Sequence, residues 1–118
     1  MGNHPNVDLM VTSPAGMQFS IDVKGLYKRN FWVIEPKAIK PNLFYVLAFV
    51  PDESANQFFI LDQATVNTEI GLGVQRAKAN AIKSGRSLEK VKLFQGVSWS
   101  FAERFQSWDL LPSWAGTQ

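Results

Sequence analysis

The stretch that decides the fold is residues 7–25, which reads VDLMVTSPAGMQFSIDVKG. It contains two runs in which apolar and polar residues alternate, joined by the turn-forming residues 13–16. This pattern predicts a β-hairpin, because successive side chains of a strand point to opposite faces. One face is expected to carry Val7, Leu9, Val11, Phe19, Ile21 and Val23, and the other Asp8, Ser20, Asp22 and Lys24.

The register of this hairpin brings two carboxylates together. A turn centred on Ala15 pairs residues whose numbers sum to thirty, so Asp8 lies across from Asp22. Cross-strand partners are about 5 Å apart at Cβ, and two bare negative charges at that distance repel by about 3 kcal/mol at an effective dielectric near 20. A positive charge is therefore expected here, supplied in part by Lys24 and in part by a divalent cation with oxygen ligands.

The D…D-x-K arrangement of Asp8, Asp22 and Lys24 resembles the PD-(D/E)xK, or restriction-endonuclease-like, nuclease superfamily. The run IDVKG at residues 21–25 looks especially like a strand of its Mrr-like and uncharacterised prokaryotic branch, and the resemblance covers residues 3–67. It implies that Asp8, Asp22 and the Val23 carbonyl bind Mg²⁺, with Mn²⁺ as a substitute, and that Lys24 acts on the attacking water. The implied activity is metal-dependent endonucleolytic hydrolysis of nucleic acid, with DNA as the expected substrate.

Two alternatives remain open. One is that the carboxylates are unrelated surface charges on a hairpin. The other is a catalytically silent nuclease-like module that binds nucleic acid or a protein partner. Replacing Asp22 separates catalysis from both, since only a nuclease loses metal binding and cleavage.

One expected part of the superfamily core has no place in this sequence. That core normally begins with a helix before the first catalytic strand, and the six residues before Val7 are too few to form it. The chain is then a fragment of a longer protein, or it has lost the helix, or another subunit, a second copy or a different chain, covers the gap.

The remaining pattern predicts one restriction-endonuclease-like α/β domain over residues 1–118, with a mixed central sheet of about five strands. Further strands are expected at residues 31–35, 43–50 and 57–61, the second of them central because it is apolar on both faces. A long helix is expected from Thr65 or Asn67 to Ser84, ended by Gly85. A C-terminal helix carrying Phe101, Phe105 and Trp108 is expected to pack on the sheet.

The formal charge of +2 is too small to indicate nucleic-acid binding by itself, but the charge is unevenly distributed. Residues 76–92 hold six basic side chains and one acid, Glu89. The alternative to a binding surface is a solvated helix face. The predicted phosphate contacts, which would bind in a salt-sensitive and sequence-independent way, are Lys28, Arg29, Arg76, Lys83 and Arg86.

Composition excludes several classes of site. The chain has no cysteine, so disulfides and thiolate zinc sites are excluded, and His4 is its single histidine. The longest apolar run, residues 43–50, is too short to cross a bilayer. We therefore expect a cytoplasmic protein with no membrane partner.

Overall fold

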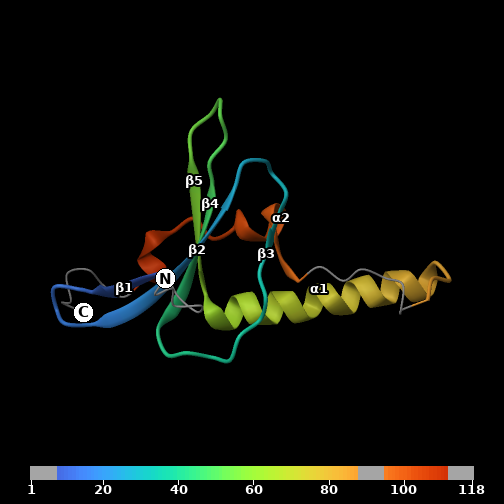
Figure 1. The fold of residues 1–118 in the computed structure, drawn as a ribbon, viewed down its shortest axis with the longest axis horizontal. Helices are drawn as coiled ribbons and strands as arrows, with labels where there is room; N and C mark the ends of the chain where they lie inside the picture. Colours follow the sequence, from blue (N-terminus) through green and yellow to red (C-terminus); the bar gives the residue numbers. More distant parts are fainter. Residues whose placement is uncertain (1–7, 88–94, 112–118) are drawn as a thin grey trace, which may run out of the picture.

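The computed structural model describes residues 8–87 and 95–111 and confirms the predicted α/β class (Figure 1). The strands are β1 (Leu9–Thr12), β2 (Gln18–Leu26), β3 (Phe31–Val33), β4 (Leu43–Phe49), β5 (Gln57–Asp62) and β6 (Gly96–Ser98). The helices are α1 (Gln63–Lys83), α2 (Trp99–Ala102) and the short 3₁₀ helix η2 (Trp108–Leu110). The predictions that involve His4, Glu89 and the residues before Asp8 concern parts of the chain outside the described residues, as do Lys90 and Lys92, two of the six basic side chains of residues 76–92.

The central sheet is mixed, as predicted, and has the strand order β1-β2-β4-β5 within the described residues. Strands β2 and β4 are parallel, whereas β1–β2 and β4–β5 are antiparallel. The third predicted strand, β3, does not join this sheet but pairs with β6 in a second, two-stranded sheet. The reason is that two parallel neighbours need a crossover connection, and β3 belongs to the crossover from β2 to β4.

The hairpin has the predicted register. Leu9 pairs with Ile21 and Thr12 with Gln18, so paired residue numbers sum to thirty. The turn is closed by hydrogen bonds from the Ser13 N–H to the Met17 carbonyl and from the Gly16 N–H to the Ser13 carbonyl, both 2.8 Å. Gly16 has a φ of +88°, a conformation that glycine adopts without steric cost.

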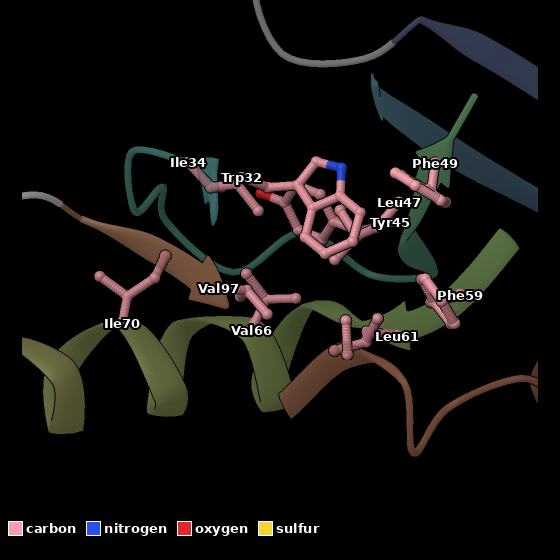
Figure 2. Close-up of a cluster of buried hydrophobic side chains, with 11 residues drawn as sticks. Trp32, Ile34, Tyr45, Leu47, Phe49, Phe59, Leu61, Val66, Ile70 and Val97 are labelled. Carbon is pink, nitrogen blue, oxygen red and sulfur yellow. The ribbon is translucent and has the colours of Figure 1, made fainter. Parts of the chain in front are cut away.

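The larger hydrophobic cluster lies between the central sheet and a layer formed by β3, β6 and α1 (Figure 2). Strand β4 contributes to both faces, and six of its seven residues are buried, which confirms its predicted central position. The larger cluster contains Trp32, Ile34, Tyr45, Leu47, Phe49, Phe59, Leu61, Val66, Ile70, Val97 and Ala102. Phe19, Ile21, Val46 and Ile60 form a smaller cluster on the opposite face of the sheet.

The burial of side chains on both faces of the hairpin differs from the prediction. On the apolar face Phe19 and Ile21 are buried, but Leu9 is 53% and Val23 41% exposed. The polar face carries Asp22, which pairs in register with Tyr45 of the larger cluster and is only 4% exposed. The prediction placed charge on an open face, whereas the crossover and α1 cover this face of the sheet.

Helix α1 begins slightly earlier than predicted, because Asp62 caps it by accepting a hydrogen bond from the Thr65 N–H at 2.7 Å. It ends at Lys83, and Gly85, with a φ of +71°, follows as expected. In Figure 1 its C-terminal half extends beyond the sheet.

The predicted C-terminal helix is short. Helix α2 ends at Ala102, and Phe101 and Phe105 still pack against the larger cluster. Trp108 lies in η2 and is 52% exposed, so its assignment to one helical stripe with the two phenylalanines was wrong. The chain leaves the helix because the Phe105 carbonyl accepts a hydrogen bond from the Ile60 N–H at the edge of β5. Within the described residues, no helix is both long and apolar enough to cross a membrane.

Candidate functional site

The candidate site is centred on Asp22, a carboxylate buried in the middle of β2. Its side chain is 6% exposed and touches two ammonium groups. Asp22 Oδ2 accepts a hydrogen bond from Lys37 Nζ at 2.6 Å, and Asp22 Oδ1 lies 3.4 Å from Lys24 Nζ. An ionised carboxylate is kept in such a position only when it is paired, so the expectation of positive charge near Asp22 is confirmed.

Asp8 is held by the backbone of β2. The Asp8 N–H donates to the Ile21 carbonyl at 3.0 Å, and Asp8 Oδ2 accepts a hydrogen bond from the Val23 N–H at 2.8 Å. The N–H and C=O groups of one strand residue point to the same side of the strand. The Val23 carbonyl therefore faces the same side of β2 as Asp8. The structure thus places the Asp8 carboxylate against the backbone of the residue that follows Asp22, whereas the Asp22 carboxylate contacts the two lysines.

Lys37 belongs to the connector between β3 and β4, residues 34–42, and α1 holds this connector in place. Gln63 Oε1 accepts a hydrogen bond from the Lys40 N–H at 2.8 Å, and Gln63 Nε2 donates to the Ala38 carbonyl at 3.1 Å. Asn67 Nδ2 donates to the Lys37 carbonyl at 3.0 Å. Gln63 is 3% exposed, so these bonds replace water for a buried amide. The first turns of α1 thereby position the Lys37 side chain over Asp22.

Tyr45 lies beside Asp22 on β4 and adds a polar group to the site. Its side chain is fully buried, and its hydroxyl has no hydrogen-bond partner within the described residues. Burial, and after it the charge of Asp22, raise the pKa of Tyr45 to about 12. The hydroxyl therefore stays protonated near neutral pH and remains a donor that lacks an acceptor. Buried donors are nearly always satisfied, so this hydroxyl is an unusual feature of the described part of the chain.

These groups fit a hard divalent cation. Mg²⁺ prefers carboxylate, carbonyl and water oxygens, and Asp8, Asp22 and Val23 supply the first two kinds on neighbouring strands. The charges of two carboxylates and of the two lysines sum to zero, so a bound dication makes the site positive and suited to a phosphate.

The structure separates the predicted phosphate contacts from this site. Lys28 and Arg29 follow β2 in an exposed turn, and the Arg29 guanidinium carbon lies 5.0 Å from the Trp99 ring centroid. Lys83 and Arg86 lie at the far end of α1, about 30 Å from its first turn at 1.5 Å per residue. The basic residues at this end of α1 do not border Asp22, and only a ligand as long as a nucleic acid reaches both places.

Arg76 is engaged within the protein. Its guanidinium Nη2 lies 2.7 Å from Oε2 of the buried Glu69. The pair lines a cavity of about 600 Å³ between α1 and the β3–β6 sheet. Arg76 remains 60% exposed, so it can contact phosphate only in competition with Glu69.

Sequence reasoning missed Lys37, Tyr45, Gln63 and Asn67. A weak signal existed for a second cation, because one lysine does not balance two facing carboxylates. Nothing in the pattern of the connector selects Lys37 over its other lysine, Lys40.

No protein-family model matches the chain, and neither a curated protein nor a solved structure matches it.

Proposed function

We propose that the chain is a metal-dependent nuclease, or the catalytic core of one, that hydrolyses phosphodiesters of nucleic acid, with DNA as the main candidate. The observation that carries the proposal is the position of the Asp8 carboxylate. It is bonded to the Val23 N–H, between Asp22 and Lys24 in the sequence of β2. The Asp8 carboxylate therefore contacts the segment of β2 that also carries Asp22 and Lys24, which supports the proposed set of two carboxylates, a backbone carbonyl and a lysine.

The burial of Asp22 supports this proposal over a pair of unrelated surface charges. A carboxylate with a 6% exposed side chain loses most of its hydration, and an apolar residue at this position would avoid that loss. Buried ionisable groups that have specific charged partners are concentrated at functional sites. The resemblance of the D…D-x-K arrangement to the PD-(D/E)xK superfamily points to the same chemistry.

In the proposed reaction Asp8, Asp22 and the Val23 carbonyl hold Mg²⁺, which when bound supplies Lewis acidity and lowers the pKa of a coordinated water. Lys24 donates to the oxygen of the attacking water and orients it toward phosphorus. The water oxygen forms a bond to phosphorus as the bond from phosphorus to the leaving oxygen breaks, and the proton that the water loses passes through solvent to the leaving oxygen. Lys24 also stabilises the negative charge that develops on the phosphate.

Metal titration tests the proposal most directly. Mn²⁺ and Mg²⁺ are titrated calorimetrically into the chain and into Asp8→Asn and Asp22→Asn, with Asp52→Asn in the exposed β4–β5 loop as a matched control. We expect binding in the parent and the control and its loss in both site variants. Cleavage of single- and double-stranded DNA and of RNA by the same proteins then identifies the substrate. Metal binding that survives both site substitutions contradicts the proposal.

A second candidate is a catalytically silent nuclease-like module that binds nucleic acid or a protein partner. The observation that favours it is the 2.6 Å ion pair of Lys37 with Asp22, which balances the site without a metal. Salt-dependent DNA binding without metal binding or cleavage is the expected result for this candidate. Neutralising Lys83 and Arg86 then lowers the salt dependence if the end of α1 contacts the phosphates.

Partners and location follow from this proposal. Nucleic acid is the main partner in this proposal, and a second copy of the chain or another chain is a further candidate partner. We place the activity in the cytoplasm, consistent with the absence of cysteine.

A further inference from the structure

We propose that Lys37 is a built-in competitor of the metal ion: its ammonium group occupies the Asp22 oxygen that a divalent cation needs, and it moves to the substrate phosphate when the cation binds. This inference rests on the proposed function of the same site. It assigns a role to a residue that lies outside the D…D-x-K arrangement.

The two lysines at Asp22 differ in geometry. Lys37 Nζ lies 2.6 Å from Asp22 Oδ2, and the Lys37 side chain is 19% exposed. Lys24 Nζ lies 3.4 Å from Asp22 Oδ1, and its side chain is 38% exposed. Lys37 therefore makes the shorter and less hydrated contact, and it holds Oδ2 directly.

A metal ion cannot take the same position while the ammonium remains. A dication on Asp22 Oδ2 would lie within a few ångströms of Nζ, where the charges repel strongly because little water screens them. The lysine must swing away, and metal binding loses the energy of the Lys37–Asp22 contact. The affinity of the site for metal is therefore lower than its carboxylates alone would give.

The connector allows this movement without unfolding. Hydrogen bonds from Gln63 and Asn67 hold its backbone at residues 37, 38 and 40, so the backbone need not move when the Lys37 side chain rotates. Its ammonium also lies 5.7 Å from the Tyr45 ring centroid. In this proposal the displaced ammonium stays beside the metal and donates to an oxygen of the bound phosphate.

The experiment is a calorimetric titration of Mn²⁺ into the parent chain and into Lys37→Met, Lys37→Arg and Lys40→Met. Methionine keeps the length and apolar stem of lysine and removes the charge. We expect Lys37→Met to tighten Mn²⁺ binding about tenfold or more, and Lys37→Arg to return it toward the parent value. Lys40→Met, on the same connector but exposed, is expected to leave the affinity within about twofold. Circular dichroism verifies folding, and Lys37→Gln is the second neutral variant if Lys37→Met does not fold.

A second measurement tests the transfer to phosphate. Binding of a short DNA duplex in the presence of Ca²⁺, which takes the same kinds of oxygen ligands as Mg²⁺, is expected to weaken in Lys37→Met although metal binding tightens. The two effects of opposite sign distinguish a competing cation from a merely structural lysine.

The outcomes separate this inference from the proposed function. If the parent binds Mn²⁺ and Lys37→Met binds it equally or more weakly, the inference is overturned and the metal site stands. If neither the parent nor any variant binds Mn²⁺, the metal site and the inference both fail. Binding by Lys37→Met alone supports the inference in its strongest form.

Discussion

Replacement of Lys37 is expected to destabilise the fold mainly through Asp22. At 2.6 Å and an effective dielectric near 20, the attraction between the two charges is about 6 kcal/mol. Loss of water from both groups offsets most of it, so the net contribution of a charged hydrogen bond is about 1.5 to 3 kcal/mol. We therefore expect a coupling free energy of about 2 kcal/mol between Asp22 and Lys37.

Lys24 provides an internal comparison. Its contact with Asp22 is longer, at 3.4 Å, and its side chain is twice as exposed as that of Lys37. Ion pairs with one solvent-exposed member typically contribute less than about 1 kcal/mol. The coupling of Asp22 to Lys37 is expected to exceed its coupling to Lys24 by about 1 kcal/mol or more.

The assay is a pair of double-mutant cycles measured by urea unfolding in metal-free buffer. One cycle combines Asp22→Asn with Lys37→Met and the other combines it with Lys24→Met. The free energy of unfolding of each single and double variant gives the coupling directly. Equal couplings in the two cycles, or a coupling below about 0.5 kcal/mol for Lys37, would refute the argument that burial makes this contact the dominant one.

Two further predictions concern the neighbours of this pair. In a Tyr27→Phe background Tyr45 is the one tyrosine left of two, and its phenolate absorbance is expected to develop near pH 12, because burial and then Asp22 raise its pKa to about 12. Because the pKa of Tyr45 is higher in the folded protein than in the unfolded chain, its stabilising effect is fully present below about pH 10. The free energy of unfolding should therefore fall between about pH 10 and pH 12. Asp22→Asn should lower the midpoint of the Tyr45 absorbance titration. A midpoint near pH 10 in the protein that keeps Asp22 would contradict the raised pKa of Tyr45. Gln63→Ala removes one accepted and two donated hydrogen bonds to the connector and is expected to cost about 2 to 3 kcal/mol in urea unfolding. Gln63→Glu keeps the acceptor for the Lys40 N–H but turns a buried carboxylate oxygen toward the Lys37 and Ala38 carbonyls, so it should cost at least as much as Gln63→Ala. A clearly smaller loss would show that the donated bonds contribute little.

Local patterns predicted the elements whose partners are close in sequence. Alternation over residues 7–25 predicted the hairpin and its register, since a short turn leaves few ways to pair the two runs. The apolar run of β4 predicted a central strand, and Gly85 predicted the end of α1 within two residues. The contact between Asp22 and Lys24 follows from their spacing of two residues on one strand, which puts both side chains on the same face.

Long-range arrangements were not predictable in the same way. Strand β3 was assigned to the central sheet because its residues favour strands, but its partner β6 lies more than sixty residues away in sequence. Trp108 was placed on a helical stripe by its spacing, whereas a backbone hydrogen bond to the edge of β5 redirects the chain at Phe105. Neither contact leaves a periodic signal in the sequence.

The same division holds for the candidate site. The sequence by itself predicted the hairpin that carries Asp22 and the lysine, Lys24, that follows Asp22 on the same face. Only the tertiary structure decided that Asp22 is buried, that Lys37 reaches it, and that Tyr45 lies beside it with its hydroxyl unpaired within the described residues. The physical reason is the parallel pairing of β2 with β4, which requires a crossover, and this crossover covers one face of the sheet and brings the connector over Asp22.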